Sequence, residues 1–140
     1  MTREAIVDLL ERRVAVFNDG DVEGFVEAYA ADAVVESPLG GTHQGRAAIG
    51  AVVKAFFEAF EDATLTTDAM IIDGDNAVHV VSLSGTDTGG FMGMAPSGRP
   101  ALVPIVNVCR VADGHITHER RVYDFTGLLV QIGVLKAKPA

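Results

Sequence analysis

The residues best suited to chemistry in this sequence lie in one short segment near the C-terminus, which reads Glu119-Arg120-Arg121-Val122-Tyr123. The segment predicts a β-strand, in which alternate side chains share a face, so Glu119, Arg121 and Tyr123 point the same way. Turned toward a pocket, they would supply an acid or base, a fixed cation and a phenol, the groups from which proton-transfer sites are built. Turned toward solvent, Arg120 and Arg121 would only pair with acidic neighbours, and periodicity alone leaves both arrangements open.

Three weaker candidates for the same pocket lie elsewhere in the chain. Asn107 follows Ile105 in an apolar run, where a polar amide either hydrogen-bonds internally or faces a ligand, and we favour the pocket. Ser37 ends a short β-branched run before Pro38, and a turn-forming hydroxyl explains it at least as well. Arg13 lies at the edge of an apolar helical stripe, where most arginines extend along the surface to water.

Other residues with reactive side chains have ordinary structural explanations. Cys109 lies among valine and isoleucine in a predicted strand, so we expect a buried core thiol, and a single cysteine cannot form an internal disulfide. Asp124 directly precedes a helical pattern and is expected to cap it. His115 and His118 are three positions apart on a strand and are expected on opposite faces, so we predict no metal site. The glycines between residues 85 and 93 match no nucleotide-binding motif.

Three amphipathic helices are predicted to come first among the elements that must position these side chains. Apolar residues recur at helical spacing before residue 18, from 22 to 29, and from 45 to 60. The third of these segments brings Phe56 and Phe60 to one face, which needs a broad apolar cover such as a sheet.

The remaining segments predict strands and a short final helix. Turn sequences rich in Gly, Asp and Asn separate these strands, as in hairpins, and a longer glycine-rich loop occupies residues 87–99. The sequence therefore predicts an α+β fold, a cone in which three N-terminal helices pack on a strongly curved antiparallel sheet, with a ligand pocket at the wide end. The predicted strands are residues 33–37, 65–72, 77–86, 101–111 and 116–123, and the final helix follows Asp124.

Composition limits the class of protein. The 140 residues suit one domain, 1–140, and 49% of them are hydrophobic, which is enough for a sizeable core. No apolar run reaches the roughly 18 residues that a membrane span needs, and a net charge of −8 argues against nucleic-acid partners. The acidic first segment lacks the apolar core of a secretory signal, so we expect a cytoplasmic location and no membrane association. We also expect no cofactor, because neither a nucleotide-binding motif nor a metal site is predicted.

Several motifs spread along nearly the whole chain resemble one family. They look like the SnoaL-like polyketide cyclase branch of the nuclear transport factor 2 superfamily, which also includes ketosteroid isomerase and limonene epoxide hydrolase. The resemblance implies the cone fold, a homodimer formed through the sheet face, and an inward orientation for Glu119, Arg121, Tyr123 and Asn107. The motifs are Asn18-Asp19-Gly20-Asp21, Gly45-Arg46-Ala47-Ala48-Ile49, Phe91 to Arg99, Asp113 to Ile116 and Asp124 to Gly133.

The family's catalytic residues are replaced at the matching positions. The resemblance places the acid/base aspartate of the cyclases, and a catalytic aspartate of the epoxide hydrolase, at Arg121, and the cyclase histidine at Asn107. It places the ketosteroid isomerase base at Ser37, its oxyanion-hole tyrosine near Arg13 and its oxyanion-hole aspartic acid at Asn107. No known catalytic set is therefore intact.

Two roles for the pocket follow from this replacement. A guanidinium stays protonated and cannot act as a base, so Arg121 is expected to anchor a carboxylate or stabilise an enolate or alkoxide, with Glu119 or Tyr123 handling protons. Alternatively, Glu119 and Arg121 pair with each other and the pocket binds its ligand without chemistry. The expected catalytic residues are Glu119, Arg121, Tyr123 and Asn107, and the expected pocket residues are Ser37, Arg13, Phe56, Phe60 and Ile105.

We therefore expect a cofactor-independent enzyme that acts by proton transfer, as a cyclase, isomerase, hydratase or hydrolase, on a small apolar oxygenated metabolite such as a polyketide. The alternative is a small-molecule binding protein with the same fold. A third possibility is an interaction module that uses the exposed face of its sheet.

Overall fold

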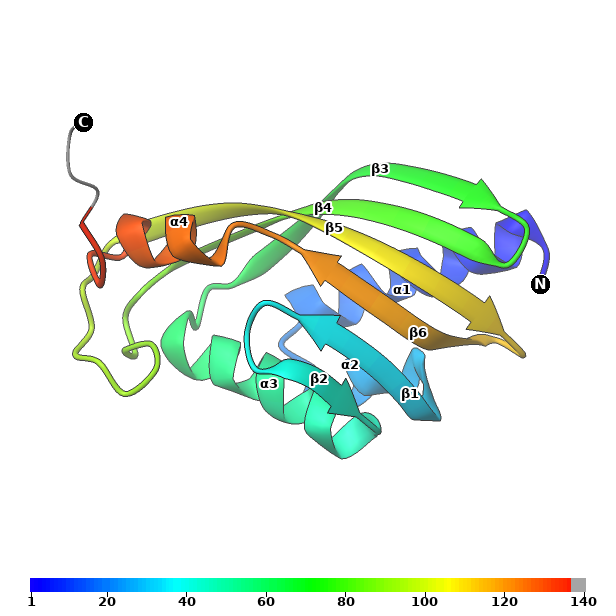
Figure 1. The fold of residues 1–140 in the computed structure, drawn as a ribbon, viewed down its shortest axis with the longest axis horizontal. Coiled ribbons are helices and arrows are strands. Elements are labelled where there is room, and N and C mark those ends of the chain that lie inside the picture. Colours follow the sequence, from blue (N-terminus) through cyan, green and yellow to red (C-terminus); the bar gives the residue numbers. More distant parts are fainter. Residues whose placement is uncertain (137–140) are drawn as a thin grey trace.

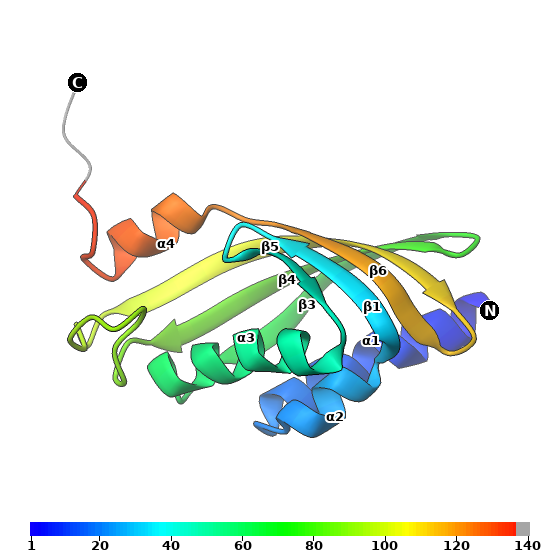
Figure 2. The ribbon, with the colours of Figure 1, turned by 60° about the horizontal axis from the view of Figure 1, so that its bottom comes forward.

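The computed structural model describes residues 1–136, in which helices cover one face of a curved six-stranded sheet (Figure 1). Turning the molecule shows α1, α2 and α3 on the same side of the sheet, while α4 lies at the end far from the N-terminus (Figure 2). The elements are α1 (Arg3–Asn18), α2 (Val22–Glu27), β1 (Tyr29–Ser37), β2 (Gly41–Gln44), α3 (Arg46–Ala59), β3 (Thr64–Asp73), β4 (Asn76–Thr86), β5 (Pro100–Ala112), β6 (His115–Val122) and α4 (Phe125–Gln131).

The predicted helices are present, and side-chain caps define where two of them begin. Thr2 accepts a hydrogen bond from the amide of Ala5 at the start of α1, and Asp21 accepts one from Gly24 at the start of α2. The second helix stops at Glu27, earlier than predicted, because Tyr29 already belongs to β1. These short, capped segments place the apolar faces of the helices against the sheet.

The sheet differs from the expected antiparallel arrangement because it is mixed. Its strand order is β2-β1-β6-β5-β4-β3, and β1 pairs with β6 in parallel while the other neighbours are antiparallel. The predicted strand 33–37 is longer and starts at Tyr29, and β2 lies where no strand was predicted. Pairing between β1 and β6 joins segments some 85 residues apart in sequence, such as Val35 and Glu119, which no local pattern could predict.

Alternation along β5 separates the two faces of the sheet. Odd-numbered residues such as Ile105, Asn107 and Cys109 are buried against the helices, while even-numbered residues such as Leu102 and Val108 are exposed. The pairing of Asn107 with Arg121, and of Cys109 with Glu119, extends the same inner face onto β6. The predicted inward orientation of the 119, 121 and 107 side chains is therefore present.

A bulge in β6 changes the expected positions of two histidines. The register shifts between Arg110 and Val111, so Ala112 pairs with His115 and Arg110 pairs with His118. Both histidines therefore lie on the outer face, although their spacing in a regular strand would place them on opposite faces. In the described part of the chain, no group of three or more His, Cys, Asp or Glu side chains is placed to hold a metal ion.

The final helix closes one end of the inner space. Asp124 caps it as predicted, accepting a hydrogen bond of 2.8 Å from the amide of Gly127. Gln131 attaches it to β5 through hydrogen bonds of 2.7 and 3.0 Å to the backbone of Leu102, and Leu128 is buried beneath it. Within residues 1–136, each helix is too short or too polar to cross a lipid bilayer.

We predict that Asp124→Ala lowers the free energy of unfolding by about 1 kcal/mol, because it removes the only side-chain cap of α4. Asp124→Asn, which keeps a capping oxygen, should remain close to the original stability. Urea unfolding of the three proteins measures the difference. Equal stability of the alanine variant and the unchanged protein would show that this cap does not hold α4 in place.

Candidate functional site

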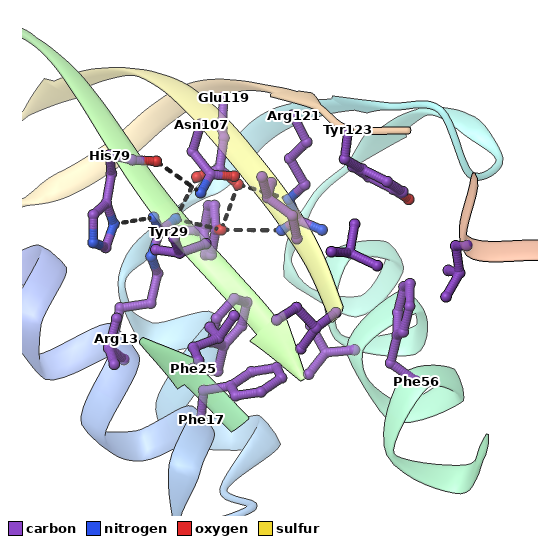
Figure 3. Close-up of a pocket in the computed structure, with 18 residues that line it drawn as sticks. Arg13, Phe17, Phe25, Tyr29, Phe56, His79, Asn107, Glu119, Arg121 and Tyr123 are labelled. Atoms are coloured by element: carbon purple, nitrogen blue, oxygen red, sulfur yellow. Dashed lines mark hydrogen bonds and ion pairs between the residues drawn. The ribbon is translucent and has the colours of Figure 1, made fainter. Parts of the chain in front are cut away.

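A cavity lies between the inner face of the sheet and the helices, inside the predicted cone-shaped fold (Figure 3). It holds about 690 Å³ of empty space, part of which opens to solvent. Most of its wall is apolar and includes the rings of Phe17, Phe25 and Phe56. The polar lining residues gather on one side and are Arg13, Tyr29, His79, Asn107, Glu119, Arg121 and Tyr123.

The carboxylate of Glu119 is the centre of this polar side. Its side chain is fully buried, and one oxygen accepts hydrogen bonds from Arg13 and from the thiol of Cys109, the latter at 3.2 Å. The other oxygen accepts from the Tyr29 hydroxyl at 2.7 Å and from Nε of Arg121 at 2.9 Å. Both oxygens are therefore occupied by groups from three other elements and from β6 itself.

This environment removes Glu119 from acid/base chemistry near neutral pH. Burial alone would raise the pKa of the carboxyl, but the charges of Arg13 and Arg121, together with their hydrogen bonds and that of Tyr29, outweigh it and hold the pKa well below its ordinary value. A carboxylate with so low a pKa is a weak base. The expectation that Glu119 handles protons is thus not supported, and the expected alternative, an ion pair with Arg121, is what the structure contains.

Tyr29 connects the three charged groups and stays neutral. Its hydroxyl accepts hydrogen bonds from Arg13 at 2.8 Å and from Nη2 of Arg121 at 3.1 Å, and it donates to Glu119. Burial, opposed by the charge of Arg13 and reinforced by that of Glu119, raises the pKa of Tyr29 to about 12. The phenol therefore links Arg13, Glu119 and Arg121 into one buried hydrogen-bonded network.

His79 is fully buried on β4 and is also neutral. Its Nδ1 lies 3.0 Å from Nη2 of Arg13, and a guanidinium can only donate, so Nδ1 must carry a lone pair. The remaining ring proton is then on Nε2, which donates to Oγ1 of Thr67 at 3.0 Å. Burial, and then the charge of Arg13, lowers the pKa of His79 to about 4.

Arg121 is a cation whose hydrogen-bond donors are only partly engaged by the network. Its Nε and Nη2 donate to Glu119 and Tyr29, while Nη1 makes no hydrogen bond to the part of the chain that the structure describes. No buried side-chain nitrogen or oxygen among these residues lacks a partner, so Nη1 must keep an accessible surface. Because Arg121 lines the cavity, this surface is available to a ligand.

Two neutral groups lie beside Arg121 on the polar side. The amide nitrogen of Asn107 donates to the backbone carbonyl of His79 at 3.1 Å, which leaves its amide oxygen free to accept a hydrogen bond. The Tyr123 hydroxyl lies 3.3 Å from the hydroxyl of Ser37. The cavity therefore offers a cation, a hydrogen-bond acceptor and a hydroxyl within an apolar wall.

The structure gathers most of the predicted site residues around this cavity. The exceptions are Ser37, whose hydroxyl holds the Leu39 amide and contacts Tyr123 instead of lining the cavity, and Phe60, which packs with Phe91 beside a smaller space under the end of α3. The residues that do line it are Arg13, Phe56, Ile105, Asn107, Glu119, Arg121 and Tyr123.

Sequence reasoning missed two members of the network and underestimated a third. Tyr29 was read as part of a helix stripe, and His79 was not singled out, although a polar residue at an inward strand position between Ala77 and Val81 gives the same signal as Asn107. Arg13 was expected only as a weak pocket candidate, because most arginines at such a helical position extend to water, yet it is buried and contacts partners from three strands.

The buried neutral His79 predicts a specific pH dependence of stability. As the pH falls through 6.5, its ordinary pKa, the unfolded chain binds a proton that the folded chain rejects until about pH 4. The contribution of neutral His79 to the free energy of unfolding is therefore fully present above pH 6.5. It is lost as the pH falls from 6.5 to 4, by about 3 kcal/mol in total. Urea unfolding at several pH values should show a shallower decline for His79→Gln, but not for the control His118→Gln, whose side chain is exposed. Parallel declines in all three proteins would contradict this assignment.

Comparison with solved structures identifies the same fold in several bacterial proteins. TsrD from Streptomyces laurentii is 26% identical, with a TM-score of 0.85 over 96% of this chain and 99% of its own. IdmH from Streptomyces antibioticus is 29% identical, with a TM-score of 0.79 over 91% of this chain and 97% of its own. A protein with a ketosteroid isomerase-like fold from Catenulispora acidiphila is 20% identical, with a TM-score of 0.78 over 94% and 97% of the two chains.

A search of curated proteins finds no significant match. The family model described as SnoaL-like polyketide cyclase, in contrast, matches residues 7–132, a stretch that begins in α1 and ends just after α4. It therefore includes the cavity and its polar side. Because this match extends over most of the chain and the fold agrees with it, the chain belongs to the SnoaL-like polyketide cyclase family.

Proposed function

We propose that the protein catalyses a cofactor-independent cyclisation or isomerisation of a small apolar oxygenated metabolite, such as a polyketide, in which Arg121 stabilises an enolate oxygen. The observation that supports this is the accessible Nη1 of Arg121 in a cavity that is otherwise largely apolar. A preorganised donor in such surroundings stabilises developing negative charge far better than water does. The cyclase-type fold of the family supports the same class of reaction.

The proposed reaction assigns each polar group a different task. A substrate carbonyl oxygen accepts a hydrogen bond from Arg121, a proton leaves the adjacent carbon to water, and the C–H electron pair moves toward that oxygen. The enolate carbon then attacks a second carbonyl in a cyclisation, or, in an isomerisation, a different carbon of the conjugated enolate takes a proton back from the hydronium ion formed in the first step. Tyr123 donates a proton to the new alkoxide and is reprotonated by water. Glu119 holds Arg121 in place and transfers no proton.

The engaged carboxylate restricts the substrates that could react. The charged or ionisable side chains that line the cavity include no carboxylate other than Glu119, and the Nδ1 lone pair of His79 is already bound by Arg13. Water must therefore accept the proton, which is feasible only for an acidic carbon such as one between two carbonyl groups. This requirement fits a polyketide better than a simple ketone.

A second candidate function is binding without catalysis. It is favoured by the same network, because the carboxylate of Glu119, the phenol of Tyr29 and the imidazole of His79 already form hydrogen bonds within the protein. None of these three groups is therefore free to take a proton from a ligand. A binding protein would hold the ligand through the same contacts but would not change its rate of enolisation. Hydrogen–deuterium exchange at the acidic carbon of a bound ligand distinguishes the two functions.

We predict that Arg121→Met lowers kcat/KM for cyclisation of a 1,3-dicarbonyl substrate by about 100-fold or more, as removal of an oxyanion donor commonly does. The matched control is Arg120→Met, one residue earlier on the outer face, which should stay within about twofold because Arg120 only pairs with Glu36. Steady-state kinetics on a substrate found by screening measures both. Full activity of the Arg121→Met protein would remove Arg121 from the mechanism.

Arg121 also contacts a buried carboxylate, so loss of activity must be separated from loss of structure. Circular dichroism and unfolding should show that Arg121→Met remains folded at the assay temperature. Arg121→Lys provides a second test because it keeps the charge but not the forked geometry, and it should recover part of the lost kcat/KM.

We further propose that the protein forms a homodimer through the outer face of its sheet. Leu102, Val108 and Val122 are between 42% and 58% exposed there, which leaves an apolar surface on neighbouring strands. A two-fold axis would place this surface against its own copy and bury it.

Val108→Glu, which adds a charge to the middle of this surface, is expected to shift the protein from dimer to monomer. Met92→Glu is the control, since Met92 is also an exposed apolar residue but lies on the 87–99 loop, outside the strands. Sedimentation velocity measures the distribution of masses. A monomeric unchanged protein, or a dimer that persists in Val108→Glu, would contradict the proposed interface.

A further inference from the structure

We infer that the cavity binds its ligand as an anion, through an acidic oxygen of an enol, a phenol or a carboxylic acid carried on a flat apolar body. The inference rests on the proposed small-molecule site and specifies the charge state and chemical class of its ligand. It stands on the balance of charges around the cavity and on the direction in which the free donor of Arg121 points.

The charges that line the cavity do not cancel. Arg13 and Arg121 are permanent cations, and Glu119 is their single anionic partner among the lining residues. His79 cannot add a charge, because its Nδ1 accepts a hydrogen bond from Arg13, and Tyr29 donates its proton to Glu119. One positive charge therefore remains in excess inside a mostly apolar space.

An excess cation in this position favours an anionic guest. The arginines are largely buried, and a buried charge without a compensating partner is costly, so a bound anion would restore the balance. A neutral carbonyl can accept a hydrogen bond from Arg121, but it supplies no counter-charge. The cavity should consequently bind the ionised form of an acidic ligand more tightly than its neutral form.

The donor is also held in a fixed orientation. Nε and Nη2 of Arg121 are fastened to Glu119 and Tyr29, so the guanidinium plane cannot rotate without breaking both hydrogen bonds. Nη1 is left at the cavity surface, and planar guanidinium donors match the oxygens of phenolates, enolates and carboxylates well. Little side-chain entropy is lost when the anion binds.

The rest of the wall indicates the body of the ligand. The rings of Phe17, Phe25 and Phe56 offer flat apolar contact, and the free amide oxygen of Asn107 can accept a hydrogen bond from a hydroxyl beside the anionic oxygen. These contacts suit an acidic aromatic or polyketide-like molecule. They do not suit a phosphate or a sugar, which would need several more polar partners.

The test uses 4-nitrophenol, whose anion absorbs visible light, and its neutral analogue 4-nitroanisole. A pH titration of 4-nitrophenol with saturating protein should show that its apparent pKa falls by at least one unit, which means that the anion binds at least tenfold more tightly than the phenol. At a pH where 4-nitrophenol is ionised, it should bind at least tenfold more tightly than 4-nitroanisole.

Two variants connect the effect to Arg121. Arg121→Met should abolish the pKa shift of bound 4-nitrophenol while 4-nitroanisole still binds, which also verifies that the cavity is intact. Arg120→Met, the outer-face control, should retain the full shift. If Arg121→Met does not fold, Arg121→Gln replaces it with the same expected result, because its neutral amide can take the place of Nε and donate to Glu119.

The outcomes separate this inference from the proposed function. Binding of both probes with an unshifted pKa would overturn the anionic ligand and leave the cavity as a small-molecule site. A shift that persists in Arg121→Met would overturn the role of Arg121. If the unchanged protein binds neither 4-nitrophenol nor 4-nitroanisole at millimolar concentration, both the inference and the proposed site are overturned.

Discussion

The buried carboxylate of Glu119 is the interaction on which the rest of this structure depends. It joins Arg13 from α1, Tyr29 from β1 and Arg121 from β6, while His79 on β4 and Cys109 on β5 complete the surroundings. Removing one partner from a buried ion pair costs about 3–5 kcal/mol, because the other charge is left in an apolar medium. The network therefore requires the first helix and the distant strands to meet in one arrangement, and it leaves the cavity at their junction.

The same network determines what chemistry the cavity can support. In the family's cyclases, as the resemblance implies, an aspartate at the position of Arg121 would serve as the acid or base. Here a cation lies at that position, and the neighbouring carboxylate of Glu119 forms an ion pair with it. The proposed reaction and the proposed ligand both follow from this difference in charge, because a cation at this position can stabilise negative charge but cannot remove a proton.

The apolar part of the cavity depends on elements that are stabilised separately. The helix α4, fastened by its cap and by Gln131, places Leu128 over the inner face of the sheet, while α3 supplies Phe56 from the other side. The buried ring of Phe91, at the base of the 87–99 loop, packs between Phe56 and Phe125 and closes the same end. Burial of these rings, unlike the charged network, requires no specific partner, because the hydrophobic effect is not directional.

Periodic pattern was sufficient to predict much of this protein, while long-range contacts decided the chemistry. Two-residue periodicity, supported by the resemblance, put Glu119, Arg121 and Tyr123 on the inner face with Asn107, because the side-chain direction in a regular strand is a local property. Capping by Asp124 was predictable for the same reason. The bulge that brings His115 and His118 to one face, and the parallel pairing of β1 with β6, depend on neighbours that the local sequence does not specify.

The greatest difference between the sequence-based prediction and the structure concerns Arg13 and Glu119. They are 106 residues apart, and their ion pair exists only because α1 packs against the inner face of the curved sheet (Figure 2). By its sequence alone, Glu119 was a candidate acid or base and Arg13 a residue at the edge of a helix stripe. The sequence determined which groups share a face, since that depends on strand periodicity, and its resemblance to the family indicated that this face is the inner one. Only the tertiary structure decided which groups neutralise one another and which cation remains free, since charge pairing depends on distances between segments far apart in the chain.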